Sequence, residues 1–144
     1  MSRVSTYLNF QGNTEEAFNF YASVFGTEVG DIFRIGDMVD QGGPELTDAE
    51  KKMVGHVELP ILAGHVLMAT DMIESMGQVR VIGNNATINL EPDTKVETDR
   101  LYAALSDGGS ESIGLSDMPW GYWGCTLDKY GTRWMFNCYE GVGQ

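Results

Sequence analysis

Apolar and polar residues alternate along several short stretches of the chain, and this period of two predicts β-strands. In residues 3–10, for example, Leu8 and Phe10 fall on one side of the extended chain, whereas Tyr7 and Asn9 fall on the other. The strands predicted in this way are residues 3–10, 28–36, 54–60, 66–71, 86–90 and 110–115, together with the two arms of a hairpin within residues 120–139.

Two longer stretches have apolar residues at helical spacing instead. The first follows Asn13, a residue that can cap a helix, with a glutamate three positions later, and it runs to Gly26. The second follows Thr94 with the same glutamate spacing and stops at the glycine pair at 108–109. A single helical turn is predicted near residues 47–50, after a loop over residues 37–45.

The hairpin predicted within residues 120–139 holds all three tryptophans and both cysteines. Residues 128–131 have the composition of its turn. A short regular loop would place Cys125 opposite Met135. One face would then carry Trp123, Cys125, Met135 and Asn137, and the other Trp134, Phe136 and Cys138. The first face mixes apolar bulk with polar groups, which suits the wall of a ligand cavity or a subunit interface.

The order strand, helix and three strands occurs twice. Shifting the chain by eighty residues aligns residues 8–10 with 88–90 and Thr14 with Thr94, and the capping signals repeat with them. A duplicated βαβββ unit is therefore predicted, in the α+β class. The expected organisation is a single domain over residues 1–144, with module 1 at about residues 3–73 and module 2 at about residues 84–140.

Composition and charge argue against some classes of binding partner. The chain has 144 residues, 42% of them hydrophobic, and a formal net charge of −12, which disfavours binding to nucleic acid and to anionic membranes. No apolar run is as long as a membrane span, and the first residues lead into a strand pattern rather than a signal peptide. We therefore expect a cytoplasmic protein without nucleic-acid or membrane partners.

The two cysteines are expected to be unpaired, because they point to opposite faces of the hairpin.

With this order of elements, the chain resembles the vicinal oxygen chelate superfamily of glyoxalases, bleomycin-resistance proteins and extradiol dioxygenases, and within it the PhnB-like group. The segments that carry the resemblance are YLNFQGN at 7–13, EAFNFY at 16–21, VFG at 24–26, HVEL at 56–59, LMATD at 67–71, DKYG at 128–131 and Trp134. The resemblance implies two curved mixed sheets around a cavity, often in a homodimer. It does not fix an activity, because this fold hosts unrelated chemistries.

The resemblance also locates where metal enzymes of the superfamily hold their ion. By alignment, those places are Ser5, Met68, Thr87 and Met135 in this chain. Hydroxyl and thioether groups are poor ligands for zinc, nickel or iron. We therefore expect no metal and no other cofactor. A displaced partial site built from His56 and Glu58 is the alternative.

Three functions remain open. The first is metal-free binding of a small, unidentified molecule in the cavity, as in the bleomycin-resistance branch. The residues expected to line that cavity are Tyr7, Asn9, His56, Met68, Asn89, Trp123, Met135 and Asn137. The second is a lyase, isomerase or dioxygenase in which His56 is a general base whose pKa is set by Glu58. The third is a dimeric scaffold with a cavity filled by its own side chains. The sequence has no glycine-rich strand-to-helix turn for a methyl-donor cofactor.

Overall fold

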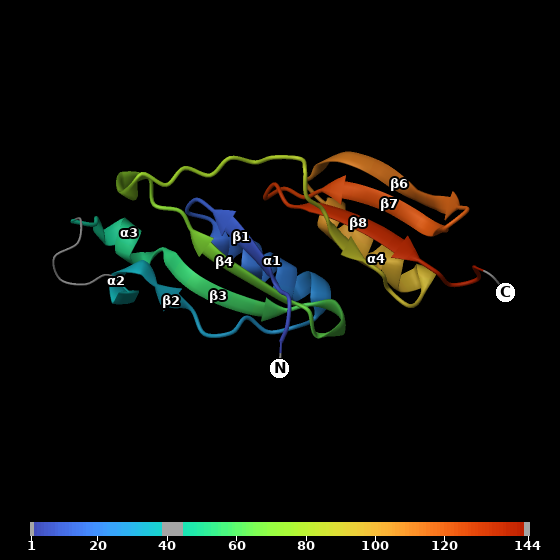
Figure 1. Ribbon diagram of the computed structural model, residues 1–144, viewed down its shortest axis with the longest axis horizontal. Coiled ribbons are helices and arrows are strands. Elements are labelled where there is room, and N and C mark those ends of the chain that lie inside the picture. The colour runs from blue at the N-terminus through green and yellow to red at the C-terminus, as the bar shows by residue number, and fades with distance from the viewer. Residues whose placement is uncertain (1, 39–44, 143–144) are drawn as a thin grey trace. The chain divides into compact units, whose positions relative to one another are not determined.

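The computed structural model describes residues 2–38 and 45–142. The chain divides into two compact units, Met1–Val81 and Ile82–Gln144, and each unit contains one four-stranded sheet and one long helix (Figure 1). The predicted α+β class with two βαβββ modules is confirmed. Within the described residues, neither long helix nor any of the shorter ones has the length and apolar character needed to cross a membrane.

The first unit contains β1, α1, β2, two short helices, β3 and β4 in chain order. Its elements are β1 (Thr6–Phe10), α1 (Thr14–Phe25), β2 (Phe33–Arg34), α2 (Ile35–Met38), α3 (Asp48–Lys52), β3 (Val54–Pro60), η1 (Leu62–Gly64), β4 (Val66–Asp71) and η2 (Glu74–Met76). The strand order across the sheet is β1-β4-β3-β2, with β1 parallel to β4 and the other neighbours antiparallel.

The second unit repeats this topology. Its elements are β5 (Ile88–Leu90), α4 (Lys95–Ser106), β6 (Ser110–Met118), β7 (Gly121–Leu127) and β8 (Arg133–Cys138). The strand order is β5-β8-β7-β6, again with one parallel pair, β5 and β8, followed by two antiparallel pairs. In both units, therefore, the first strand leads into the long helix and pairs with the last strand.

The predicted strand over residues 28–36 is largely wrong. Only Phe33–Arg34 form a strand, and the chain turns into α2 at Ile35. The pairing register of β2 with β3 shifts between Phe33 and Arg34, so a regular ladder does not extend past this point. The predicted loop over residues 37–45 begins inside α2, and its residues 39–44 lie outside the described residues.

The core of the first unit lies between α1 and one face of its sheet. In β4, every second residue is buried, namely Leu67, Ala69 and Asp71, whereas the residues between them are half-exposed. Phe18 and Tyr21 of α1 are fully buried as well, and α1 contacts β3 and β4. The alternation seen in the sequence thus assigns one face of the sheet to α1 and leaves the opposite face more open.

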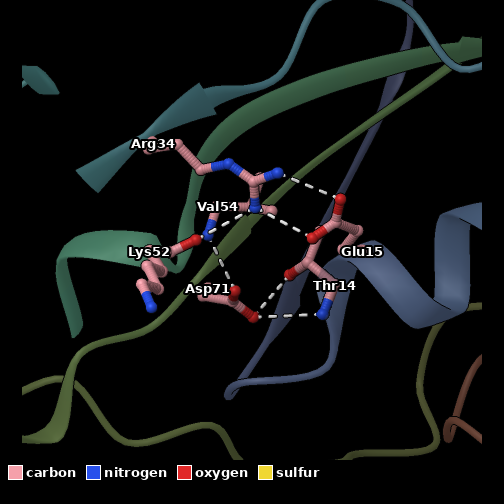
Figure 2. A network of polar contacts seen from close by, with 6 residues as sticks. All are labelled: Thr14, Glu15, Arg34, Lys52, Val54 and Asp71. Carbon is pink, nitrogen blue, oxygen red and sulfur yellow. Dashed lines mark hydrogen bonds and ion pairs between the residues drawn. The ribbon is translucent and has the colours of Figure 1, made fainter. Parts of the chain in front are cut away.

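A buried carboxylate fastens the start of α1 to the sheet (Figure 2). Asp71 is 3% exposed, and its Oδ1 accepts hydrogen bonds from the backbone N–H of Gly12 (2.9 Å), the backbone N–H of Thr14 (3.1 Å) and the Thr14 hydroxyl (2.7 Å). Its Oδ2 accepts from the backbone N–H of Val54 at 2.9 Å. The predicted cap, Asn13, makes no capping bond through its side chain. The negative charge at the positive end of α1 is supplied by β4 instead.

The two helix starts give a direct test of capping. At α4, Thr94 accepts a hydrogen bond from the backbone N–H of Glu97 at 3.1 Å, as predicted. We expect Thr94→Ala to lower the free energy of unfolding by about 1 kcal/mol, because this N–H loses its acceptor. Asn13→Ala should leave stability nearly unchanged. Urea unfolding followed by circular dichroism measures both, and equal losses in the two variants would contradict this assignment of caps.

Candidate functional site

The predicted site residues fall into two groups, one on each sheet. The first group lies on the open face of the first sheet, opposite the face that α1 covers. We call this surface the His56 face and define it by Tyr7 and Asn9 on β1, His56 and Glu58 on β3 and Met68 on β4. The strand register supports this grouping, because Met68 is the partner of Tyr7 on one side and of Glu58 on the other.

His56 is held on two sides. The Tyr7 hydroxyl lies 3.1 Å from Nδ1 of His56, and a carboxylate oxygen of Glu58 lies 3.5 Å from its Nε2. The ring of Tyr7 is centred 5.7 Å from the imidazole, and the ring of Phe33, on the adjacent strand β2, is centred 6.4 Å from it. Arg3 reaches Glu58 from the chain start, at 3.6 Å. The imidazole is therefore fixed in position and has aromatic rings beside it.

The roles of the two ring nitrogens depend on the tautomer of the imidazole. The tautomer with its proton on Nε2 directs an N–H toward the Glu58 carboxylate, and in that tautomer Nδ1 accepts from the Tyr7 hydroxyl. Partial burial raises the pKa of Tyr7 above its usual value of 10.0, so the phenol keeps its proton at neutral pH. The oxygen of Tyr7 retains acceptor capacity toward a ligand.

The four positions expected from the resemblance to match metal ligands carry hydroxyl and thioether groups. The Ser5 hydroxyl donates to the sulfur of Met68 at 3.7 Å, Thr87 is exposed, and Met135 pairs with Asn89 across β5 and β8. Within residues 2–38 and 45–142, no three or more His, Cys, Asp or Glu side chains gather closely enough to hold a metal ion. The displaced site would have only His56 and Glu58 as ligands in the described chain.

The second group lies on the second sheet. Cys125 is the cross-strand partner of Met135, as predicted, and Trp123 is the partner of Asn137. Trp123 packs edge-to-face against Trp120, at 6.1 Å between ring centroids, and Trp120 is half-exposed. Asn137 is only 6% exposed, and its amide nitrogen donates to the Trp120 carbonyl at 3.4 Å. Trp123 and Met135 are therefore more accessible on this sheet than Asn137.

Two further predictions concern single residues of the second unit. Asn89 is exposed, and its amide nitrogen donates to a carboxylate oxygen of Glu91 at 3.0 Å. Cys125 and Cys138 are both free thiols, the first half-buried and the second fully buried, as the hairpin register predicts.

A cleft of about 300 Å³ lies elsewhere in the first unit, beside the start of α1. Arg34 and Glu15 lie on its wall and form a two-pronged ion pair, with N–O distances of 2.8 and 3.0 Å (Figure 2). This hydrogen bonding lowers the pKa of Glu15 and raises that of Arg34. The Lys52 carbonyl accepts a further bond from Arg34. None of the predicted site residues lines this cleft, and its two paired charges already satisfy each other.

Sequence reasoning missed two residues that contact the His56 face. Phe33 is brought beside His56 by the pairing of β2 with β3, which joins positions 33 and 56. Arg3 reaches Glu58 through a long flexible side chain. An apolar residue in a short edge strand and a basic residue near the chain start have no distinctive local pattern. The signal for Phe33 was the strand pairing, which the sequence by itself did not specify.

Comparisons with known proteins place this geometry in a family. The family model described as 3-demethylubiquinone-9 3-methyltransferase matches residues 2–136. The solved structure of protein PA1353 from Pseudomonas aeruginosa is 31% identical, with a TM-score of 0.81, and the match covers 96% of this chain and 98% of that one.

Two more relatives agree. A PhnB protein from Bacillus cereus is 27% identical, with a TM-score of 0.71 and coverage of 95% and 99% of the two chains. Protein YjdN of Escherichia coli (strain K12) is 22% identical over 141 residues, which are 93% of each chain. Because the family model matches residues 2–136, which is most of the chain, and a PhnB protein matches over nearly its whole length, the chain belongs to this PhnB-like family.

Proposed function

We propose that this protein binds a small organic molecule at the His56 face without a metal ion. The observation that carries the proposal is the imidazole of His56, fixed between the Tyr7 hydroxyl and the Glu58 carboxylate. Tyr7 and Phe33 are 47% and 52% exposed, so their rings offer apolar contact area next to oriented polar groups. Small-molecule sites combine these two features.

The family description names a methyltransferase, and the first strand-to-helix turn argues for binding rather than methyl transfer. Doubly wound folds bind cofactors where a glycine-rich turn leads into a helix and the helix N-terminus faces the ligand. In this protein, Gly12 is the one glycine of this turn, and the backbone N–H groups of Gly12 in the turn and of Thr14 at the start of α1 are bonded to the Asp71 carboxylate. The chain's own anion therefore occupies the place that a cofactor would need.

The proposal is tested by screening a library of small molecules for thermal stabilisation in the presence of EDTA. We expect hits that stabilise the protein, and we expect His56→Ala to weaken their binding about tenfold or more, because the oriented polar group is lost. His65→Ala is the matched control. Its ring bonds to the Thr6 hydroxyl at 2.9 Å, and Thr6 precedes Tyr7 on β1 and points to the other side of the sheet. Equal binding by wild type and His56→Ala would contradict the assigned site, and stabilisation that EDTA removes would contradict the metal-free mode.

Catalysis is the second candidate, and the same contacts favour it. A general base needs an oriented imidazole, and the carboxylate of Glu58 beside Nε2 of His56 supplies one orienting partner. The hydroxyl of Tyr7 contacts Nδ1 at 3.1 Å, so in this candidate Tyr7 passes the proton to the imidazole. Turnover of a bound ligand that is abolished in both His56→Ala and Tyr7→Phe would favour this candidate over binding alone.

The proposal also includes a homodimer in the cytoplasm. Superfamily resemblance implies the dimer, and the two free cysteines suit a reducing compartment. Sedimentation equilibrium would measure the mass of the assembly against the 15.9 kDa of one chain.

A further inference from the structure

We propose that the ligand of the His56 face is an organic cation, an ammonium group that carries an aromatic or alkyl substituent. This inference rests on the proposed function and adds the chemical class of the ligand. It follows from the hydrogen-bond directions at His56, from the position of Arg3, and from the arrangement of aromatic rings on the same face.

The hydrogen-bond directions leave acceptors for the ligand. In the tautomer of His56 with its proton on Nε2, the Tyr7 hydroxyl donates its only proton to Nδ1, and the phenol oxygen is then an acceptor for a ligand. Glu58 adds a carboxylate, and its side chain is 44% exposed, so it is accessible. An ammonium group carries donors and no acceptor, and it therefore matches both groups. A ligand carboxylate would meet lone pairs and a like charge.

Arg3 already places a cation beside the carboxylate of Glu58. Its guanidinium lies 3.6 Å from Glu58, and the two side chains are 57% and 44% exposed. An exposed ion pair of this kind contributes little to stability, so a ligand can displace it. Arg34, on β2 at the other edge of the sheet, is held by Glu15 at the start of α1. Arg3 thus marks the site of the ligand's charge and competes for it.

The aromatic rings offer an organic cation a second kind of contact, in addition to the ion pair with Glu58. The rings of Tyr7 and Phe33 lie 5.7 and 6.4 Å from the imidazole, and both are about half-exposed. Aromatic faces attract organic cations and also bury their apolar substituents. The net charge of −12 acts in the same direction at long range, by concentrating cations near the protein.

Matched triplets of ligands test the charge directly. Phenethylammonium, 2-phenylethanol and phenylacetate have the same ring and nearly the same length, and longer and bicyclic homologues of each complete the series. Isothermal titration of the full chain at neutral pH should rank the cation first, by about tenfold over the neutral compound. The anion should bind most weakly.

Two substitutions should change this ranking in opposite directions. Glu58→Gln keeps the shape and removes the charge, so the preference for the cation over the neutral compound should fall about tenfold. Arg3→Ala removes the competitor, and cation affinity should rise about threefold. Glu16→Gln is the control, because Glu16 is an exposed glutamate on α1, the helix that covers the opposite face of the sheet.

The possible failures are distinguishable. If the neutral or anionic members bind as tightly as the cations, and His56→Ala still weakens that binding, the cationic class is overturned and the proposed binding function stands. If Arg3→Ala lowers cation affinity, the competing role of Arg3 is overturned together with the class. If no member of any triplet binds to the folded protein, the inference and the proposed function both fall.

Discussion

Asp71→Ala is expected to lower the free energy of unfolding by about 3–5 kcal/mol, because it removes one acceptor group from several buried donors at once. Alanine would leave the backbone N–H groups of Gly12, Thr14 and Val54 without their present partner, in a region where Asp71 itself is 3% exposed. Urea unfolding followed by circular dichroism measures the loss.

Two further variants separate this effect from a general loss of charge. Asp31→Ala removes an exposed carboxylate of the first unit and should change stability by less than about 0.5 kcal/mol. Asp71→Asn keeps the shape and one acceptor oxygen, so its loss should lie between those of the two alanine variants. A loss below about 1 kcal/mol for Asp71→Ala would show that water replaces the carboxylate, and the view of Asp71 as the anchor of α1 would be wrong.

The second large effect is expected at Trp134, where alanine should cost about 3–5 kcal/mol. The indole is fully buried in the second unit, and its N–H donates to Asp128 Oδ2 at 2.8 Å. Truncation leaves a large cavity and also removes this donor from a buried carboxylate. Thermal or urea unfolding of the purified variant measures the change.

Trp120→Ala is the matched control, because Trp120 is 50% exposed and should lose much less stability. Trp134→Phe keeps most of the ring volume and removes the N–H, so it should cost about 1–3 kcal/mol. Equal losses at positions 120 and 134 would contradict the burial on which this prediction depends.

The hairpin shows how well local pattern predicts local register. Cys125 was expected opposite Met135, and the two residues are cross-strand partners. A short turn leaves few choices of register, and a slip by one residue would expose Trp134 and Phe136, both fully buried. The same argument explains why β3 and β4 were predicted with correct ends.

The two wrong predictions, of one strand and of one helix cap, have a common cause. Both features depend on contacts with residues far away in the sequence. The strand predicted over residues 28–36 is much shorter in the structure, where it is β2. Its length is set by pairing with β3 and not by its own composition. The sequence predicted Asn13, which directly precedes the helix, as the cap of α1. The group that caps α1 is the carboxylate of Asp71, which lies fifty-seven residues after Thr14 in the chain. Capping by a local side chain was predicted correctly at Thr94.

The sequence by itself determined the α+β class, the two βαβββ repeats and the choice of which strand face is polar, because hydrophobic periodicity and turn residues act over a few positions. It also brought His56 and Glu58 to one face, since they are two residues apart on one strand. Only the tertiary structure decided that Phe33 and Arg3 lie beside that pair and that the Tyr7 hydroxyl contacts the imidazole. Those contacts join segments far apart in the chain, and strand pairing and side-chain reach across a folded sheet are needed to form them.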